Sequence, residues 1–220
     1  HCRRAPGDAG GTHRRRAHRR PHVRLERHHE LARTAAAESA VLLANDGELL
    51  PLTPPGGQTV AVIGEFACSP RYQGAGSSQV VPTKLDNALD AILDREGADR
   101  VTFAPGFTFD GIPDDDMVTE AVDAARRADV AVLFLGLPSA TESEGFDRTD
   151  IELPADQIAL LEAVHGANPN TVVVLANGGV VSIELGRIMP PQSSRAGYSA
   201  RRAARRLPIF CSASRIRPAA

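Results

Sequence analysis

The sequence predicts an α/β fold: a three-layer α/β/α sandwich around a mostly parallel sheet, incomplete at its C-terminal end. Short runs of β-branched and apolar residues, typical of strands buried on both faces of a parallel sheet, recur over residues 59–177. Segments with apolar residues at helical spacing separate these runs, so strand and helix alternate. One globular domain is expected, because 220 residues with 42% hydrophobic content are too few for two large cores.

The elements follow one another in a regular order. Residues 29–43 have high helix propensity and an apolar stripe, which predicts a helix. The Gly-, Pro- and Asp-rich segment 45–58 predicts a connector whose leucines lie against the sheet. Four apolar runs predict strands at 59–64 (TVAVIG), 101–104 (VTFA), 129–136 (DVAVLFLG) and 171–177 (TVVVLAN). The intervening helices are expected at 85–96, 115–128 and 154–167.

Three loops are expected to form any functional site. In an open parallel sheet, ligands bind in the crevice beyond the carboxyl ends of the strands. The loops that leave those ends are 65–82, 105–116 and 137–153.

The first loop is rich in glycine and serine. Residues 74–78 (GAGSS) could form a backbone nest for a phosphate, but their spacing matches neither the dinucleotide fingerprint nor the phosphate loop, so an ordered surface loop is the stronger interpretation. Arg71, Tyr72 and Gln73 beside them offer a planar donor fork, an aromatic face and an amide. Such groups hold sugar hydroxyls.

The third loop concentrates carboxylates. Five lie within eleven residues: Glu142, Glu144, Asp147, Asp150 and Glu152. Crowding of like charges is expected to raise carboxyl pKa values, and a general acid near neutral pH needs a raised pKa. A solvated acidic loop is the alternative, and spacing alone does not decide between the two.

Five stretches of this sequence form one recognisable set of landmarks: 33–52 (RTAAAESAVLLANDGELLPL), 60–64 (VAVIG), 70–78 (PRYQGAGSS), 144–148 (EGFDR), and Leu153-Pro154 with Gln157. Together they resemble family 3 glycoside hydrolases over residues 28–184. One departure from the family pattern is Ala44, where the family usually has Lys.

The resemblance implies the C-terminal α/β domain of a retaining, β-glucosidase-type enzyme that acts on β-linked glycosides. It implies a nucleophilic Asp on a barrel domain and an acid/base Glu on this domain. We assign the acid/base role to Glu144, with Glu142 as the alternative. The residues expected to shape the sugar site are Arg71, Tyr72, Gln73 and Arg148, although Arg148 could equally pair with Asp147.

The barrel domain is expected to be a missing partner, because no barrel sequence precedes residue 28. The 220 residues alone are therefore expected to be inactive. The alternative is a non-catalytic module that binds sugar or packs against a separate barrel.

No cofactor or metal is expected, since the three cysteines form no CxxC pair and adjoin no His cluster. Without an 18-residue apolar run or an apolar leader, neither a membrane span nor secretion is indicated, and a cytoplasmic location is expected.

Both ends of the chain differ from its acidic middle. Residues 1–27 hold nine Arg against two acids, and 187–220 hold eight Arg and no acid. Arms of this kind can bind nucleic acid, but Lys and interleaved aromatics are lacking, so no nucleic-acid partner is expected. A one-base frameshift near Glu184 explains the second tail better: the shifted codons of 207–220 permit ADLLFGVANPSGG, close to what the family has next. We expect 1–27 and 185–220 to be out of frame and disordered.

Overall fold

The computed structural model describes residues 25–45, 48–52, 57–77, 79–145 and 147–182, and the backbone of 209–213. The chain divides into two compact units, 1–38 and 39–220. Helix α1 spans Leu25–Ser39, and its residues 25–38 are the part of the first unit that the structure describes. No helix within the described ranges is both long and apolar enough to cross a membrane.

The second unit is built on one six-stranded sheet. Its strands lie in the order β1-β6-β5-β4-β2-β3. Neighbouring strands from β6 to β3 are parallel, and β1 alone runs antiparallel, against β6. The strands are β1 (Ala40–Ala44), β2 (Val60–Ile63), β3 (Val101–Ala104), β4 (Val130–Gly136), β5 (Thr171–Asn177) and β6 (Ile209–Ala213). The predicted mostly parallel sheet is confirmed.

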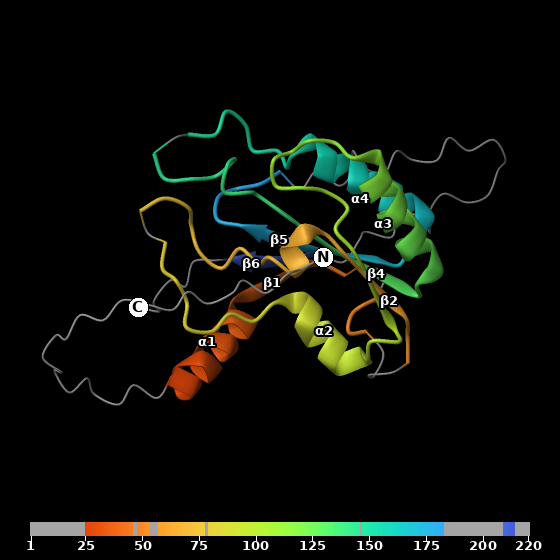
Figure 1. Ribbon diagram of the computed structural model, residues 1–220, viewed down its shortest axis with the longest axis horizontal. Helices are drawn as coiled ribbons and strands as arrows, with labels where there is room; N and C mark the ends of the chain where they lie inside the picture. The colour runs from red at the N-terminus through yellow and green to blue at the C-terminus, as the bar shows by residue number, and fades with distance from the viewer. Residues whose placement is uncertain are drawn as a thin grey trace, which may run out of the picture. The chain divides into compact units, whose positions relative to one another are not determined.

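Helices cover both faces of this sheet (Figure 1). Helices α3 (Asp115–Arg127) and α4 (Ala155–Ala167) lie on one face, and α2 (Ala88–Glu96) lies on the other. The side chains of Asn87 and Asp114 cap α2 and α3 by accepting backbone N–H groups three residues on, which fixes where these helices begin. The predicted three-layer α/β/α arrangement is confirmed.

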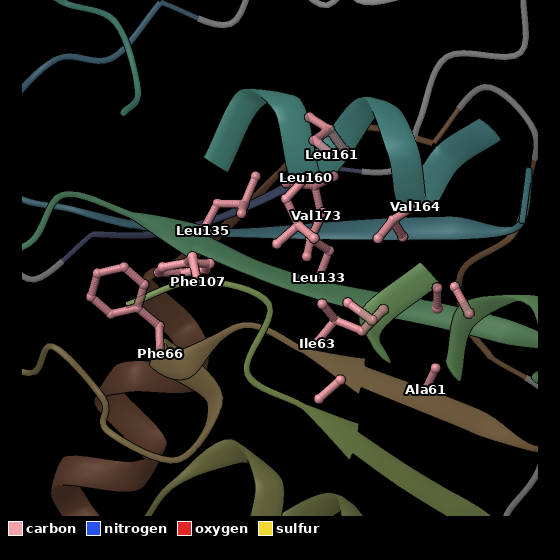
Figure 2. Close-up of a cluster of buried hydrophobic side chains, with 14 of the residues drawn as sticks. Ala61, Ile63, Phe66, Phe107, Leu133, Leu135, Leu160, Leu161, Val164 and Val173 are labelled. Atoms are coloured by element: carbon pink, nitrogen blue, oxygen red, sulfur yellow. The ribbon is translucent and has the colours of Figure 1, made fainter. Parts of the chain in front are cut away.

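The core consists of two layers separated by the sheet. Along β2, Ala61 and Ile63 face the α3 and α4 layer, whereas Val60 and Val62 face the α2 layer. Figure 2 shows the first layer, in which Leu133 and Leu135 of β4 pack against Leu160, Leu161 and Val164 of α4. Both faces of β2 and β4 are therefore buried, as the continuous apolar runs predict.

Two expectations need correction. The helix predicted at 29–43 begins at Leu25 and ends at Ser39, because the apolar run that follows forms β1. Segment 185–220, expected to be disordered, forms β6 over Ile209–Ala213, where an apolar run pairs its backbone with β5 and β1. The rest of that segment, like residues 1–24, lies outside the described residues.

Candidate active site

A pocket of about 420 Å³ opens at the carboxyl edge of the sheet. The loops after β2, β3 and β4 all contribute to it, so the three loops predicted to meet do so here. The rings of Phe66, Phe107 and Phe109 pack together beside it, with the centroids of Phe66 and Phe109 4.8 Å apart. The lining residues are Phe66, Ser69 to Ala75, Gln79 to Pro82, Phe109, Pro138 and Ser139.

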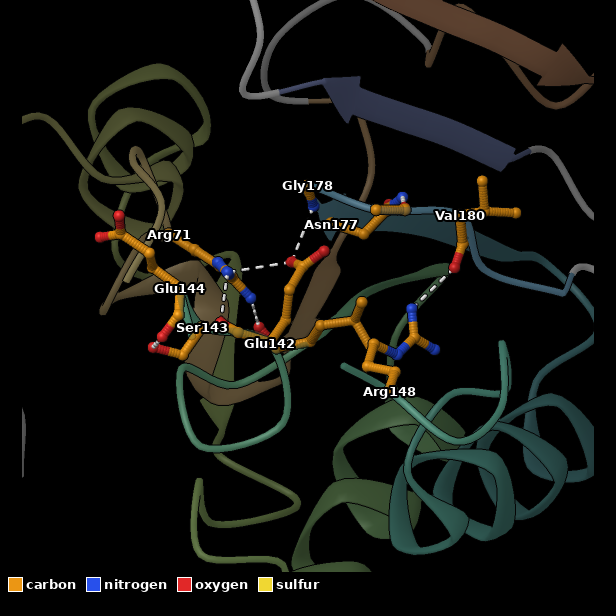
Figure 3. A network of polar contacts seen from close by, with 10 residues as sticks. Arg71, Glu142, Ser143, Glu144, Arg148, Asn177, Gly178 and Val180 are labelled. Carbon is orange, nitrogen blue, oxygen red and sulfur yellow. Dashed lines mark hydrogen bonds and ion pairs between the residues drawn. The ribbon is translucent and has the colours of Figure 1, made fainter. Parts of the chain in front are cut away.

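Arg71, which lines this pocket, forms an ion pair with Glu142 (Figure 3). Nη2 of Arg71 lies 2.9 Å from Oε2 of Glu142, and the two side chains are only 10% and 19% exposed. The same guanidinium donates to the carbonyl oxygens of Leu137 and Glu142. Oε2 of Glu142 also accepts the backbone N–H of Gly178 at 3.0 Å. Glu142 therefore joins the loops that follow β2, β4 and β5.

Glu144 has different surroundings, although it is only two residues away. Its side chain is exposed and points away from the Glu142 carboxylate (Figure 3). Its Oε2 accepts two hydrogen bonds from Ser77, one from the hydroxyl group and one from the backbone N–H at 2.9 Å. These bonds stabilise the charged form, so the Ser77 hydroxyl first, and the Ser77 N–H second, lower the pKa of Glu144.

That direction contradicts the expected effect of crowding. The carboxylates do not share one space: Glu142 faces Arg71, Glu144 faces Ser77, and Asp150 accepts the backbone N–H of Glu152. Hydrogen-bond donors therefore replace like charges as the nearest neighbours of Glu144.

Tyr72 and Gln73 line the pocket, but they use their polar groups within their own loop. The Gln73 side-chain amide forms two hydrogen bonds with the backbone of Val80. Its Nε2 donates to the Val80 carbonyl oxygen at 3.0 Å, and its Oε1 accepts the Val80 N–H at 2.9 Å. The Tyr72 hydroxyl donates to the same Val80 oxygen at 3.2 Å and accepts from Gln73. Tyr72 as a whole is 42% exposed, and with its hydroxyl bonded within the loop it offers the pocket an aromatic surface.

Arg148 connects the loop after β4 to the segment after β5. Its Nη1 donates to the carbonyl oxygen of Val180 at 2.7 Å, and its Nη2 donates to that of Glu152 at 3.0 Å (Figure 3 shows the first). The predicted alternative, a pairing with Asp147, is not among the described contacts. Arg148 therefore shapes the loop through backbone carbonyls.

Two parts of this site were not predicted. Ser77 holds Glu144, and Gly178 holds Glu142. The sequence held a weak signal for Ser77: GAGSS could form a backbone nest for a phosphate, although an ordered surface loop was the stronger interpretation. The anion that Ser77 binds is a side chain of the same domain. No comparable signal marked the glycines after β5.

The comparison with known families decides the classification. Residues 40–192 match the model of the glycosyl hydrolase family 3 C-terminal domain. The chain belongs to this family. It is 51% identical over 170 residues to the exo-α-(1→6)-L-arabinopyranosidase of Bifidobacterium longum, a match covering 72% of this chain. It is 49% identical over 160 residues to the thermostable β-glucosidase B of Acetivibrio thermocellus, covering 71% of this chain.

A solved family 3 structure agrees with the fold. The β-glucosidase of Bifidobacterium adolescentis superposes with a TM-score of 0.73 at 45% identity, covering 87% of this chain and 25% of that one. The matches to the two curated relatives cover only 22% and 21% of their lengths. This family 3 chain therefore corresponds to one domain of longer glycosidases.

Proposed function

We propose that this family 3 domain supplies the acid/base carboxyl of a retaining, β-glucosidase-type glycoside hydrolase, and that the carboxyl is Glu144. One observation carries the choice of residue. Glu144 is exposed at the carboxyl edge of the sheet, whereas Glu142 is largely buried and bonded to Arg71 and Gly178. A proton donor must reach a substrate oxygen. The exposed carboxyl of Glu144 meets this requirement better than that of Glu142, which joins three loops.

The reaction needs a second carboxylate, which we place on the barrel domain. That carboxylate attacks the anomeric carbon to form a glycosyl ester, while protonated Glu144 gives its proton to the departing glycosidic oxygen. Glu144, now a carboxylate, then takes a proton from water. The resulting hydroxide attacks the anomeric carbon, which releases the sugar and frees the nucleophile. The 220 residues alone should therefore not turn over an aryl β-glucoside, and turnover by the purified chain would contradict this division of roles.

The pKa of Glu144 has to rise when the two domains meet. Ser77 lowers it in this domain, which favours the carboxylate. A like charge nearby disfavours ionisation, and the two carboxyl groups of retaining glycosidases lie about 5–5.5 Å apart. The nucleophile would thus keep Glu144 protonated for the first step and lose this influence once it is esterified.

The relatives support a pyranoside at the non-reducing end as substrate. They are named for an arabinopyranoside, for glucosides and for xylosides. These sugars share a six-membered ring and differ in substituents that the barrel would recognise. On this domain, the aromatic surface of Tyr72 is suited to contact a sugar or leaving group.

A non-catalytic packing or sugar-binding module is the second candidate. It is favoured by the internal bonding of Arg71, Gln73 and Arg148, whose polar groups hold the domain's own loops together. Such a module would fold and dock without contributing a proton donor.

A chimera separates the two candidates. Residues 40–182 would replace the matching segment of the Acetivibrio thermocellus β-glucosidase B, which keeps that enzyme's own barrel. We expect an active chimera in which Glu144→Gln lowers kcat/KM by about 10²–10⁴-fold for poor leaving groups and much less for activated aryl glycosides. Glu142→Gln should not show that dependence on the leaving group. An inactive chimera, or equal losses for all leaving groups, would contradict the proposal.

A further inference from the structure

We propose that Gly76 and Ser77 form a cradle that positions the Glu144 carboxyl, holding Oε2 so that Oε1 is the oxygen that transfers the proton. The inference rests on the proposed role of Glu144. It adds Ser77 as a positioning residue and assigns different tasks to the two oxygens of one carboxyl.

The contacts of Ser77 fall on a single oxygen. Its backbone N–H lies 2.9 Å from Oε2 of Glu144, and its hydroxyl donates to the same atom. Residue 77 is separated from residue 144 by 67 positions, so these bonds fix the loop after β4 against the loop after β2. A side chain held at one oxygen by two donors has little freedom to rotate.

Gly76 allows the Glu144 side chain to come close enough to bond with Ser77. It has a φ of +95°, a conformation that residues with a Cβ rarely adopt. A Cβ at this position would lie 2.7 Å from Cβ of Glu144 and 2.9 Å from its Oε2. Any other residue would therefore displace Glu144 from Ser77. Two independent features of residue 76, its backbone angle and its missing side chain, serve the same contact.

Oε1 is left available. No hydrogen bond to it occurs within the described residues, and the neighbouring Ser143 hydroxyl instead faces the backbone oxygen of Glu144. Glu144 is exposed at the edge where the barrel's substrate would lie. The proton is consequently carried by the oxygen that the cradle does not occupy.

The first test uses the whole 220-residue chain and carbon-detected NMR titration of its glutamate carboxyls. Ser77→Ala removes the hydroxyl that contributes most to the lowered pKa, so the pKa of Glu144 should rise, and Ser77→Thr should restore it. Ser143→Ala is the matched control and should leave the titration of Glu144 unchanged. Gly76→Ala should raise the pKa as Ser77→Ala does. An unchanged pKa in both Ser77→Ala and Gly76→Ala would overturn the cradle.

The second test separates the cradle from the proposed function. In the chimera, Ser77→Ala should lower kcat by about 10- to 100-fold through misplacement of the carboxyl and shift the basic limb of the pH profile upward. Ser143→Ala should do neither. If Glu144→Gln shows the acid/base pattern while Ser77→Ala has a wild-type profile, the cradle is wrong and the role of Glu144 stands. If Ser77→Ala alters the titration but Glu144→Gln lacks the pattern, the catalytic role is wrong, and with it the positioning of a proton donor.

Discussion

Glu142 and Glu144 are chemically identical, and their surroundings give them different tasks. Glu142 is paired with Arg71 away from solvent, and Glu144 is held by Ser77 at the surface. A charge removed from a buried pair leaves its partner unpaired, which is costly. An exposed carboxylate has water as an alternative partner.

This difference predicts opposite effects on stability. Glu142→Gln should lower the free energy of unfolding of the 220-residue chain by about 2 kcal/mol, since the side chain of Arg71 is only 10% exposed and its guanidinium loses its counter-charge. Glu144→Gln is the matched control and should change stability little. Urea unfolding of the two variants measures this. Equal midpoints would contradict the structural role of Glu142.

The sequence predicted where the site residues lie but not which partners they contact. The acidic loop and the Arg71-Tyr72-Gln73 group were placed correctly at the sheet edge because a parallel sheet brings its loops together. The choice of partners was beyond prediction. Arg71 bonds across 71 positions and Ser77 across 67, and no local pattern encodes contacts at that separation.

At the scale of elements, strands approach one another closely at their carboxyl ends. Gly64 directly follows β2 with a φ of +107°, and a Cβ there would lie 2.1 Å from the carbonyl oxygen of Phe134. The approach is between backbones, so no side-chain movement can relieve the overlap. The position of the loop that carries Ser77 depends on this glycine.

Gly64→Ala should therefore cost at least about 3 kcal/mol, because both backbone strain and steric overlap oppose the new side chain. The control is Gly166→Ala in α4, where a Cβ would meet no atom within 4 Å. That change should leave stability unchanged or raise it by up to about 0.5 kcal/mol, since alanine has a higher helix propensity than glycine and Gly166 lies in the last turn of α4. Thermal unfolding compares them. A tolerated Gly64→Ala would show that β2 and β4 are not packed as described.

Helix α4 carries a group sensitive to pH. Burial lowers the pKa of His165 from its usual value of 6.5, and its Nδ1 is buried without a hydrogen bond among the described residues. The unfolded chain therefore binds a proton at higher pH than the folded one. The contribution of neutral His165 to the free energy of unfolding should be fully present above pH 6.5. It should be lost as the pH falls from 6.5 through the lowered pKa of the folded state. His165→Gln should remove this part of the pH dependence, and identical profiles would contradict it.

Element prediction from sequence succeeded where the pattern was continuous and failed at a junction. The strands at 60–63 and 130–136 were found because both faces of each are buried. Helix propensity and an apolar stripe extended the predicted first helix to residue 43, but Val41 and Leu42 pair with Cys211 and Phe210 of β6, about 170 positions away in the sequence. Tertiary pairing overrode the local preference.

At the scale of the whole molecule, the chain has one part of a family 3 enzyme and two ends of different composition. The family match runs to residue 192, which is eight residues past the proposed frameshift near Glu184. We propose that residues near 1–27 and from about 185 onward are out of frame. Resequencing the gene across the codons of Arg27 and Glu184 should reveal a one-base difference that restores family sequence. An unchanged frame would make the strand β6 a native part of the domain.

The most direct test of the central claim is chemical rescue of Glu144→Ala in the chimera. Azide needs no general base, so it should accelerate turnover of an activated aryl β-glucoside and yield a glycosyl azide of retained configuration. Glu142→Ala should give neither acceleration nor azide product. Rescue at Glu144 alone would establish it as the acid/base residue. Rescue at Glu142, or at neither position, would contradict the assignment.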